Sequence, residues 1–206
     1  MIASQPDLPK KYKTIDVMLD LETIGLCDNA VITQLSAIAF CMEDGTILQE
    51  FNEHIGIRNS VQKGLKVDGP SMEWWFKQPD KNYEDVFIRA MTSEVKLEDV
   101  LSRFTIWIKT LKENYGLDYK SNVNIWGNGA LADNKWIRQA YKVCNMEPPW
   151  AFHEDRDVRT IAELGRRLFN YEYRNVTFEG TIHNALDDCR HQIKYCTTIY
   201  GKILGS

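Results

Sequence analysis

The chain is 206 residues long, with 44% hydrophobic and 26% charged residues, which is typical of a soluble globular protein. No apolar stretch approaches the roughly 20 residues that span a bilayer, so we expect no membrane partner. The net charge of −4 argues against a protein that coats long stretches of a polyanion. Two bound divalent cations would cancel this charge, so the composition still permits an enzyme that grips few phosphates.

The beginning of the chain and its cysteines bear on location. Residues 1–6 lack the basic and apolar regions of a signal peptide. The five cysteines are odd in number and form no Cys-x-x-Cys pair, which favours reduced thiols in a cytoplasmic protein. Residues 1–11 are polar and contain two prolines. We predict a flexible arm there, followed by a single domain over residues 12–204.

Three apolar runs follow the arm, at 12–21, 30–41 and 46–57, and short turn-like segments separate them. Branched apolar residues recur at every second position from Ile15 to Leu19, as in a strand with one buried face. The close spacing of the runs predicts an antiparallel meander of three strands.

The rest of the chain predicts helices around one further strand. Apolar residues recur at helical spacing from Leu97 to Leu111, before Gly116. Ser71 is suited to cap a short helix that ends near Pro79. The other expected elements are a strand at 123–126, a helix from about 133 with Trp136 in the core, a helix carrying Ile161, Leu164 and Leu168, and a last helix from about 184 to 200. This order predicts an α/β fold with a mixed sheet flanked by helices.

Two carboxylates stand at the end of the first predicted strand. Asp20 and Glu22 are two residues apart, so their side chains share a face and can bind one cation or bridge two. Mg²⁺ prefers such oxygen ligands. On this pair alone, an ordinary polar surface is the better interpretation.

Further candidates lie beside the fourth strand and the last helix. Asp133 begins a helix just after the fourth strand, and on its own it is better interpreted as a cap or first-turn acid of that helix. If the first and fourth strands are central in the sheet, however, Asp133 faces the same edge as Asp20 and Glu22. Asp188 lies in the last helix shortly after His183, and its rival is Asp187, since neighbouring helical positions point about 100° apart. Histidine titrates near neutrality, as a general base should. Carboxylates converging beside a histidine are what two-metal phosphodiester hydrolysis needs.

These motifs resemble those of the DEDDh superfamily of 3′-5′ exonucleases, of the DnaQ or RNase T type. The matching residues are Asp20-x-Glu22-Thr23-x-Gly25-Leu26, Asp133, and His183-x-Ala185-x-x-Asp188. The spacing from His183 favours Asp188 over Asp187. Where many relatives carry His-Asn or Phe before the middle aspartate, this chain has Gly129-Ala130-Leu131-Ala132. Two further segments, 71–75 and 155–160, are similar to the phage exonuclease A type and the related RNase AS-like exoribonucleases. The resemblance covers about residues 14–200.

The resemblance implies an RNase H-like fold with a mixed five-stranded sheet, in which the antiparallel meander is joined by parallel strands. It also implies stepwise hydrolysis of terminal phosphodiesters to nucleoside 5′-monophosphates. In this mechanism Asp20, Glu22, Asp133 and Asp188 would hold two Mg²⁺ or Mn²⁺ ions about 4 Å apart. His183 would be the general base.

Contacts to the terminal nucleotide are implied for Thr23, Gly25 and Leu26, with the glycine letting the backbone approach the ligand. Of the adjacent Trp74 and Trp75, one is expected in the core, and we expect Trp74 to stack on a base.

The expected substrate is a single-stranded 3′ end, with DNA favoured over RNA. Arg156 and Arg159 are candidates to touch phosphate, although Arg159 could equally pair with a local acid. We expect a monomer or homodimer in a bacterial cytoplasm, encoded by the host or by a phage. Rival functions are a silent nucleic-acid-binding domain and a phosphodiesterase of small molecules.

Overall fold

The computed structural model describes residues 14–79, 83–115, 122–129 and 131–205. The predicted arm at 1–11 lies outside these residues, so its division from one domain over 12–204 stays a prediction. The strands are β1 Thr14–Thr23, β2 Ile32–Phe40, β3 Ile47–His54, β4 Asn122–Gly127 and β5 Asp155–Asp157. The helices are α1 Ile57–Gln62, α2 Gly69–Phe76, η1 Tyr83–Ile88, α4 Arg89–Thr92, α5 Leu97–Asn114, α6 Asp133–Val143, η2 Phe152–Glu154, α7 Val158–Phe169, η3 Tyr173–Asn175 and α8 Ala185–Leu204.

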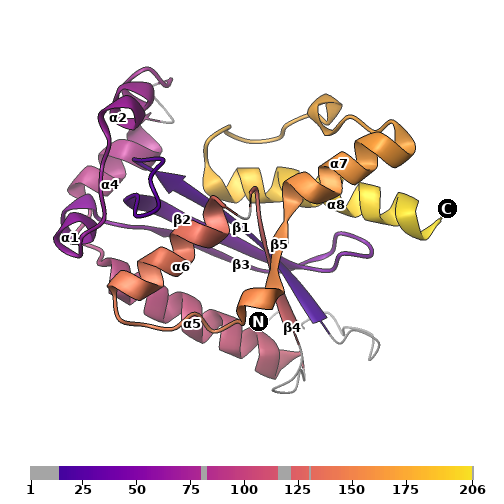
Figure 1. Cartoon of the computed structure of the whole chain (residues 1–206), viewed down its shortest axis with the longest axis horizontal. Coiled ribbons are helices and arrows are strands. Elements are labelled where there is room, and N and C mark those ends of the chain that lie inside the picture. Colours follow the sequence, from indigo (N-terminus) through magenta and orange to yellow (C-terminus); the bar gives the residue numbers. More distant parts are fainter. Residues whose placement is uncertain (1–13, 80–82, 116–121, 130, 206) are drawn as a thin grey trace, which may run out of the picture.

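The five strands form one mixed sheet in the order β3-β2-β1-β4-β5 (Figure 1). β1, β2 and β3 pair antiparallel, whereas β4 pairs parallel with β1 and β5 parallel with β4. The predicted five-stranded RNase H-like sheet is therefore confirmed. The position of β5 is not evident in the sequence, because its three residues are all charged and carry no apolar alternation.

The alternation along β1 directs its two faces toward different helices. Odd-numbered residues from Ile15 to Leu21 belong to one core with apolar side chains of α5 and α6. Met18 belongs to a second core with apolar side chains of α7 and α8. Since Asp20 and Glu22 share the parity of Met18, they face the side of the sheet that α7 and α8 cover.

Helix α2 begins at a different cap from the one that we predicted. Asp68, not Ser71, is the N-cap, and its Oδ1 accepts the N–H of Ser71 at 2.7 Å. Its Oδ2 accepts the N–H of Leu26 at 2.9 Å. An acid can satisfy both donors at once, so Asp68 ties α2 to the loop after β1.

Helix α7 buries a different stripe from the one that its leucines suggest. Val158, Ile161 and Gly165 are buried, whereas Leu164 and Leu168 are exposed. In α8, Cys189 and Cys196 are fully buried on one face, as their spacing predicts. Among the described residues, no helix has the length and apolar character needed to cross a membrane.

Candidate active site

Carboxylates from three elements meet at the end of β1. Asp20 and Glu22 come from β1, Asp133 from the first residue of α6, and Asp188 from the first turn of α8. We call these four residues the acidic cluster. Helix α8 is anchored there by β2, because Oε1 of Gln34 accepts the first backbone N–H of the helix at 3.3 Å.

Burial is the main cause that raises the pKa values of the acidic cluster, and repulsion between its carboxylates adds to it. Burial raises the pKa of Asp20 well above its usual range, and the charges of the other three carboxylates raise it further. Burial and neighbouring acids raise the pKa of Glu22 to about 8 and that of Asp188 to about 7. Within the part of the chain that the structure describes, none of the four forms an ion pair. Such a group of oxygens favours a bound cation.

Backbone groups of two strand ends hold Asp133 in place. Its Oδ1 accepts the N–H of Leu21 at 3.3 Å, and its Oδ2 accepts the N–H of Asn128 at 2.9 Å. Burial raises the pKa of Asp133 to about 6, while these two N–H groups oppose the rise. The side chain thus reaches across to β1 rather than capping α6, whose N-cap residue is Ala132.

His183 stands at the edge of the acidic cluster, just before α8. One ligand atom from each of His183, Glu22 and Asp188 lies within 4.8 Å of the other two. The imidazole ring stands edge-on to Trp74, with the ring centroids 4.8 Å apart. Burial lowers the pKa of His183, so the ring is neutral near pH 7 and can accept a proton or bind a metal. Its φ of 63° is left-handed, which is uncommon for a residue other than glycine.

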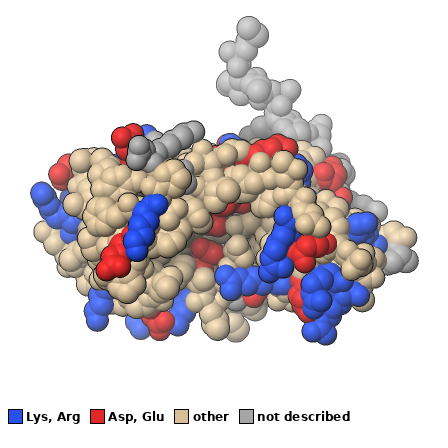
Figure 2. Space-filling view, turned by 90° about the horizontal axis from the view of Figure 1, so that it is seen from above, with Lys and Arg blue, Asp and Glu red and all other residues tan. Residues whose placement is uncertain are grey.

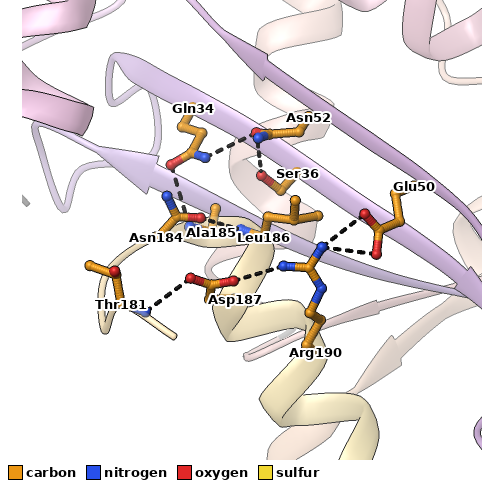
Figure 3. A network of polar contacts seen from close by, with 10 residues as sticks. All are labelled: Gln34, Ser36, Glu50, Asn52, Thr181, Asn184, Ala185, Leu186, Asp187 and Arg190. Carbon is orange, nitrogen blue, oxygen red and sulfur yellow. Dashed lines mark hydrogen bonds and ion pairs between the residues drawn. The ribbon is translucent and has the colours of Figure 1, made fainter. Parts of the chain in front are cut away.

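Asp187 belongs to a different network, as Figure 3 shows. Its Oδ2 accepts the N–H of Thr181 at 2.9 Å, and its Oδ1 accepts a hydrogen bond from Arg190 at 2.7 Å. Arg190 also donates to both carboxylate oxygens of Glu50, at 3.0 and 2.9 Å. We call Glu50, Asp187 and Arg190 the Arg190 network. It engages Asp187 and fixes the loop before His183, and it leaves Asp188 as the acid of α8 that faces the cluster.

A cleft of about 570 Å³ opens beside the acidic cluster. Figure 2 looks down on this face, where acidic side chains lie in a central hollow and basic side chains gather on the side of α7. Of the predicted nucleotide contacts, Thr23, Leu26 and Trp74 line the cleft. Leu26 is 79% exposed and Trp74 42%, whereas Trp75 is only 2% exposed and donates its Nε1–H to the carbonyl of Thr23. The expected division of the two tryptophans between core and surface is confirmed.

Gly25 has a packing role and is not among the residues that line the cleft. A Cβ atom at this position would lie 3.1 Å from Cβ of Ala30 and 3.2 Å from the carbonyl oxygen of Lys66. The missing side chain therefore lets the loop after β1 pack closely against its neighbours.

Two residues of the site, Trp136 and Gln192, go beyond the sequence-based prediction, and a third, Arg159, was a predicted phosphate contact. Trp136, expected in the core, packs on the core's edge and also lines the cleft, where its Nε1–H is donated to the carbonyl of Cys27. Gln192 donates from Nε2 to Oδ1 of Asp20 at 2.7 Å. Its position four residues after Asp188, on the same helix face, is a signal that could have indicated it. Arg159 also lines the cleft, and its charge lowers the pKa of Asp133.

Comparison with known families now identifies the chain. The model of the Rv2179c-like 3′-5′ exoribonuclease domain matches residues 15–200. The chain belongs to this family. The Rv2179c-like domain is thus a hydrolytic 3′-5′ exonuclease. It shares its fold with a solved member of the DEDDh family, in line with the resemblance stated above. Among curated proteins, none matches the chain.

Solved structures share the fold of this Rv2179c-like domain at low sequence identity. The nuclease domain of 3′hExo, a DEDDh family member bound to rAMP, has a TM-score of 0.59 and 14% identity over 96% of this chain and 94% of that chain. A 3′-exonuclease that recognises the 3′ end of the histone mRNA stem-loop has a TM-score of 0.59 and 13% identity, over 94% and 83%. E. coli Exonuclease I with a 5cy-dT13 oligonucleotide has a TM-score of 0.57 and 12% identity, over 92% and 40%.

Proposed function

We propose that this protein removes nucleoside 5′-monophosphates one at a time from the 3′ end of single-stranded RNA, with divalent cations held by the acidic cluster. The observation that carries the proposal is the convergence of four carboxylates from three elements, all without ion pairs among the described residues, beside His183 and an open cleft. If these carboxylates had only a structural role, we would expect cationic side chains to be paired with them.

The residues present fit divalent cations. Their donors are carboxylate oxygens, which suit Mg²⁺ and Mn²⁺, and Glu22, His183 and Asp188 already bring three ligand atoms close together. Asp20 and Asp133 would complete a site for two ions. When bound, such ions supply the charge that makes a coordinated water nucleophilic and that stabilises the leaving 3′-oxygen.

His183 serves as the general base in this proposal. Its ring is neutral near pH 7, because burial lowers its pKa. A ring nitrogen accepts the proton of the attacking water, and the contact with Trp74 holds the ring in place. Gln192 holds Asp20 in position through its hydrogen bond.

The walls of the cleft bind the terminal nucleotide. Leu26 and Trp74 offer apolar surface on which a base can stack, and Thr23 and Trp136 extend it. This surface accepts every base, because each base has a π-face. The nuclease therefore degrades its substrate without strong sequence preference.

RNA is proposed on the family match, since the matched family is described as an exoribonuclease domain. DNA, favoured by the resemblance to phage exonucleases, is the second candidate, and discrimination of the 2′-hydroxyl takes only one or two contacts. The test uses RNA and DNA oligomers of one sequence, labelled at the 5′ end, with Mg²⁺, Mn²⁺ or EDTA. A ladder that shortens from the 3′ end of RNA is expected, only with metal. Equal or faster shortening of DNA would replace RNA by DNA, and binding without cleavage would overturn the enzymatic proposal.

A further inference from the structure

A second hollow of about 240 Å³ adjoins the cleft along α7. Its polar lining combines α7 and η3 with the loop after β4, and we call these residues the arginine groove: Asn128, Arg159, Glu163, Arg166, Tyr173 and Arg174. Basic side chains gather on this side of the central hollow in Figure 2. Apart from Asn128 and Arg159, its residues have no part in the site as described so far.

The arginine groove carries a surplus of positive charge in an acidic protein. It is lined by three arginines and one glutamate, while the whole chain has a net charge of −4. Glu163 is shared, since it pairs both with Arg166 and with Arg167 on the outer face of the helix. Arg174 pairs with Glu172, and its side chain is 69% exposed. Arg159, Arg166, Arg167 and Arg174 thus have two glutamates among them, Glu163 and Glu172, and the side chains of Arg166 and Arg174 are largely open to solvent.

Arg159 joins the groove to the cleft, because it lines both hollows. Its Nε donates to the side chain of Asn128, whose backbone N–H holds Asp133 of the acidic cluster. The groove therefore begins at the acidic cluster and leads away from it along α7. A strand whose last phosphodiester lies at the cluster can follow this path.

We propose that the arginine groove binds the sugar-phosphate backbone of the single strand upstream of the bond that is cut, with Arg166 and Arg174 contacting phosphates. This inference rests on the proposed function and extends it to the part of the substrate that is not hydrolysed. Arginine suits the role, since its planar group donates two parallel hydrogen bonds to a phosphate. Substrates long enough to fill the groove bind more tightly than a dinucleotide.

The test compares an Arg166→Ala/Arg174→Ala double variant with Arg167→Ala. Arg167 is the matched control, because it lies on the same helix and pairs with the same Glu163 but does not line the groove. Binding of a fluorescent RNA strand of about ten nucleotides is measured by anisotropy in EDTA over a range of salt concentrations. Hydrolysis of a dinucleotide with Mg²⁺ is measured in parallel.

The double variant should bind the strand about tenfold more weakly at low salt, and the slope of log Kd against log salt should fall by roughly 0.7 for each phosphate that the variant no longer binds. Its dinucleotide hydrolysis, and both properties of Arg167→Ala, should stay close to wild type. Lysine at both positions should restore most of the binding. Unchanged strand affinity in the double variant, or an equal loss of dinucleotide hydrolysis, would overturn the proposal. A wild-type protein that binds the strand through the groove but cleaves nothing would instead reject the proposed exonuclease.

Discussion

Two groups of acidic residues lie close together around the start of α8. The charges of one are paired with an arginine, and those of the other, among the described residues, are not. In the Arg190 network, Glu50 and Asp187 share one guanidinium, and Asp187 also accepts the backbone N–H of Thr181 (Figure 3). In the acidic cluster, Asp188 and its partners repel one another, and burial raises their pKa values. Adjacent residues of one helix turn, Asp187 and Asp188, thus belong one to each group.

The presence or absence of a cationic partner distinguishes an aspartate that stabilises the fold from one that serves the proposed function. Paired acids stabilise the fold by modest amounts, about 0–1 kcal/mol when exposed. Buried acids that repel one another cost stability, and such a cost is typical of sites that bind a cation or react. The network orients the loop of His183, and the cluster performs the chemistry that we propose.

The largest effect is expected from Asp188→Asn compared with Asp187→Asn. Asp188→Asn removes a proposed cation ligand and should lower the rate of exonuclease hydrolysis on the order of 10³-fold. It should also raise Tm in EDTA at pH 8, because a buried charge is removed. Asp187→Asn should lower Tm and keep most of the activity. If the two variants lost activity alike, the distinction between cluster and network would fail.

A smaller but still large effect is expected for His183→Ala. Loss of the proposed general base should reduce kcat by about 10²- to 10⁴-fold with little change in oligomer binding. His153→Ala is the control, since His153 is exposed and does not line the cleft. The pH profile of kcat distinguishes the roles: the variant should lose the acidic limb that titration of the histidine produces. A metal affinity that drops with kcat would indicate a ligand rather than a base.

Stability of the metal-free protein should fall as the pH rises. In the unfolded chain Glu22 and Asp188 titrate near their usual pKa of about 4, whereas in the fold their pKa values are about 8 and about 7. The folded state therefore keeps protons that the unfolded state has lost, so its stability declines between about pH 4.5 and 8. Tm in EDTA should follow this decline. Mg²⁺ should flatten it, and an equally steep decline with Mg²⁺ would contradict cation binding by the cluster.

The smallest effect is expected for Trp74→Ala. Loss of one stacking surface should cost about 1 kcal/mol, which raises KM roughly fivefold and leaves kcat nearly unchanged. Trp74→Phe should recover most of the affinity, since a smaller ring can still stack. A fall in kcat alone would show that the tryptophan acts through His183 rather than on the base.

Much of the fold follows from local pattern. The meander is visible in the alternation from Ile15 to Leu19, and α5 in the helical spacing of its apolar residues. β5 is too short and too charged to be recognised, because it is specified by pairing with β4. The sequence favours Ser71 as the cap of α2, although Asp68 takes that role. One oxygen of Asp68 accepts the N–H of Leu26, and this contact with a loop 42 residues away cannot be read from the local sequence.

Site residues that belong to short sequence motifs can be predicted from the sequence, whereas those placed by tertiary packing cannot. Spacing between His183 and Asp188 selects the acid that faces the cluster, whereas the place of Trp136 on the cleft wall depends on how α6 lies against the loop after β1. The role of Gly25 likewise depends on the approach of Lys66. Contacts of this kind leave no periodic trace in the sequence.

The acidic cluster draws its members from opposite ends of the chain, with Asp20 in the first strand and Asp188 in the last helix. During synthesis, a ribosome-bound chain that has not yet reached residue 188 lacks one ligand of the cluster and cannot form α8. On the assignment proposed above, such a nascent chain cannot hydrolyse the messenger that encodes it. On this assignment, activity begins only after the residues of α8 have been synthesised and have folded onto β1.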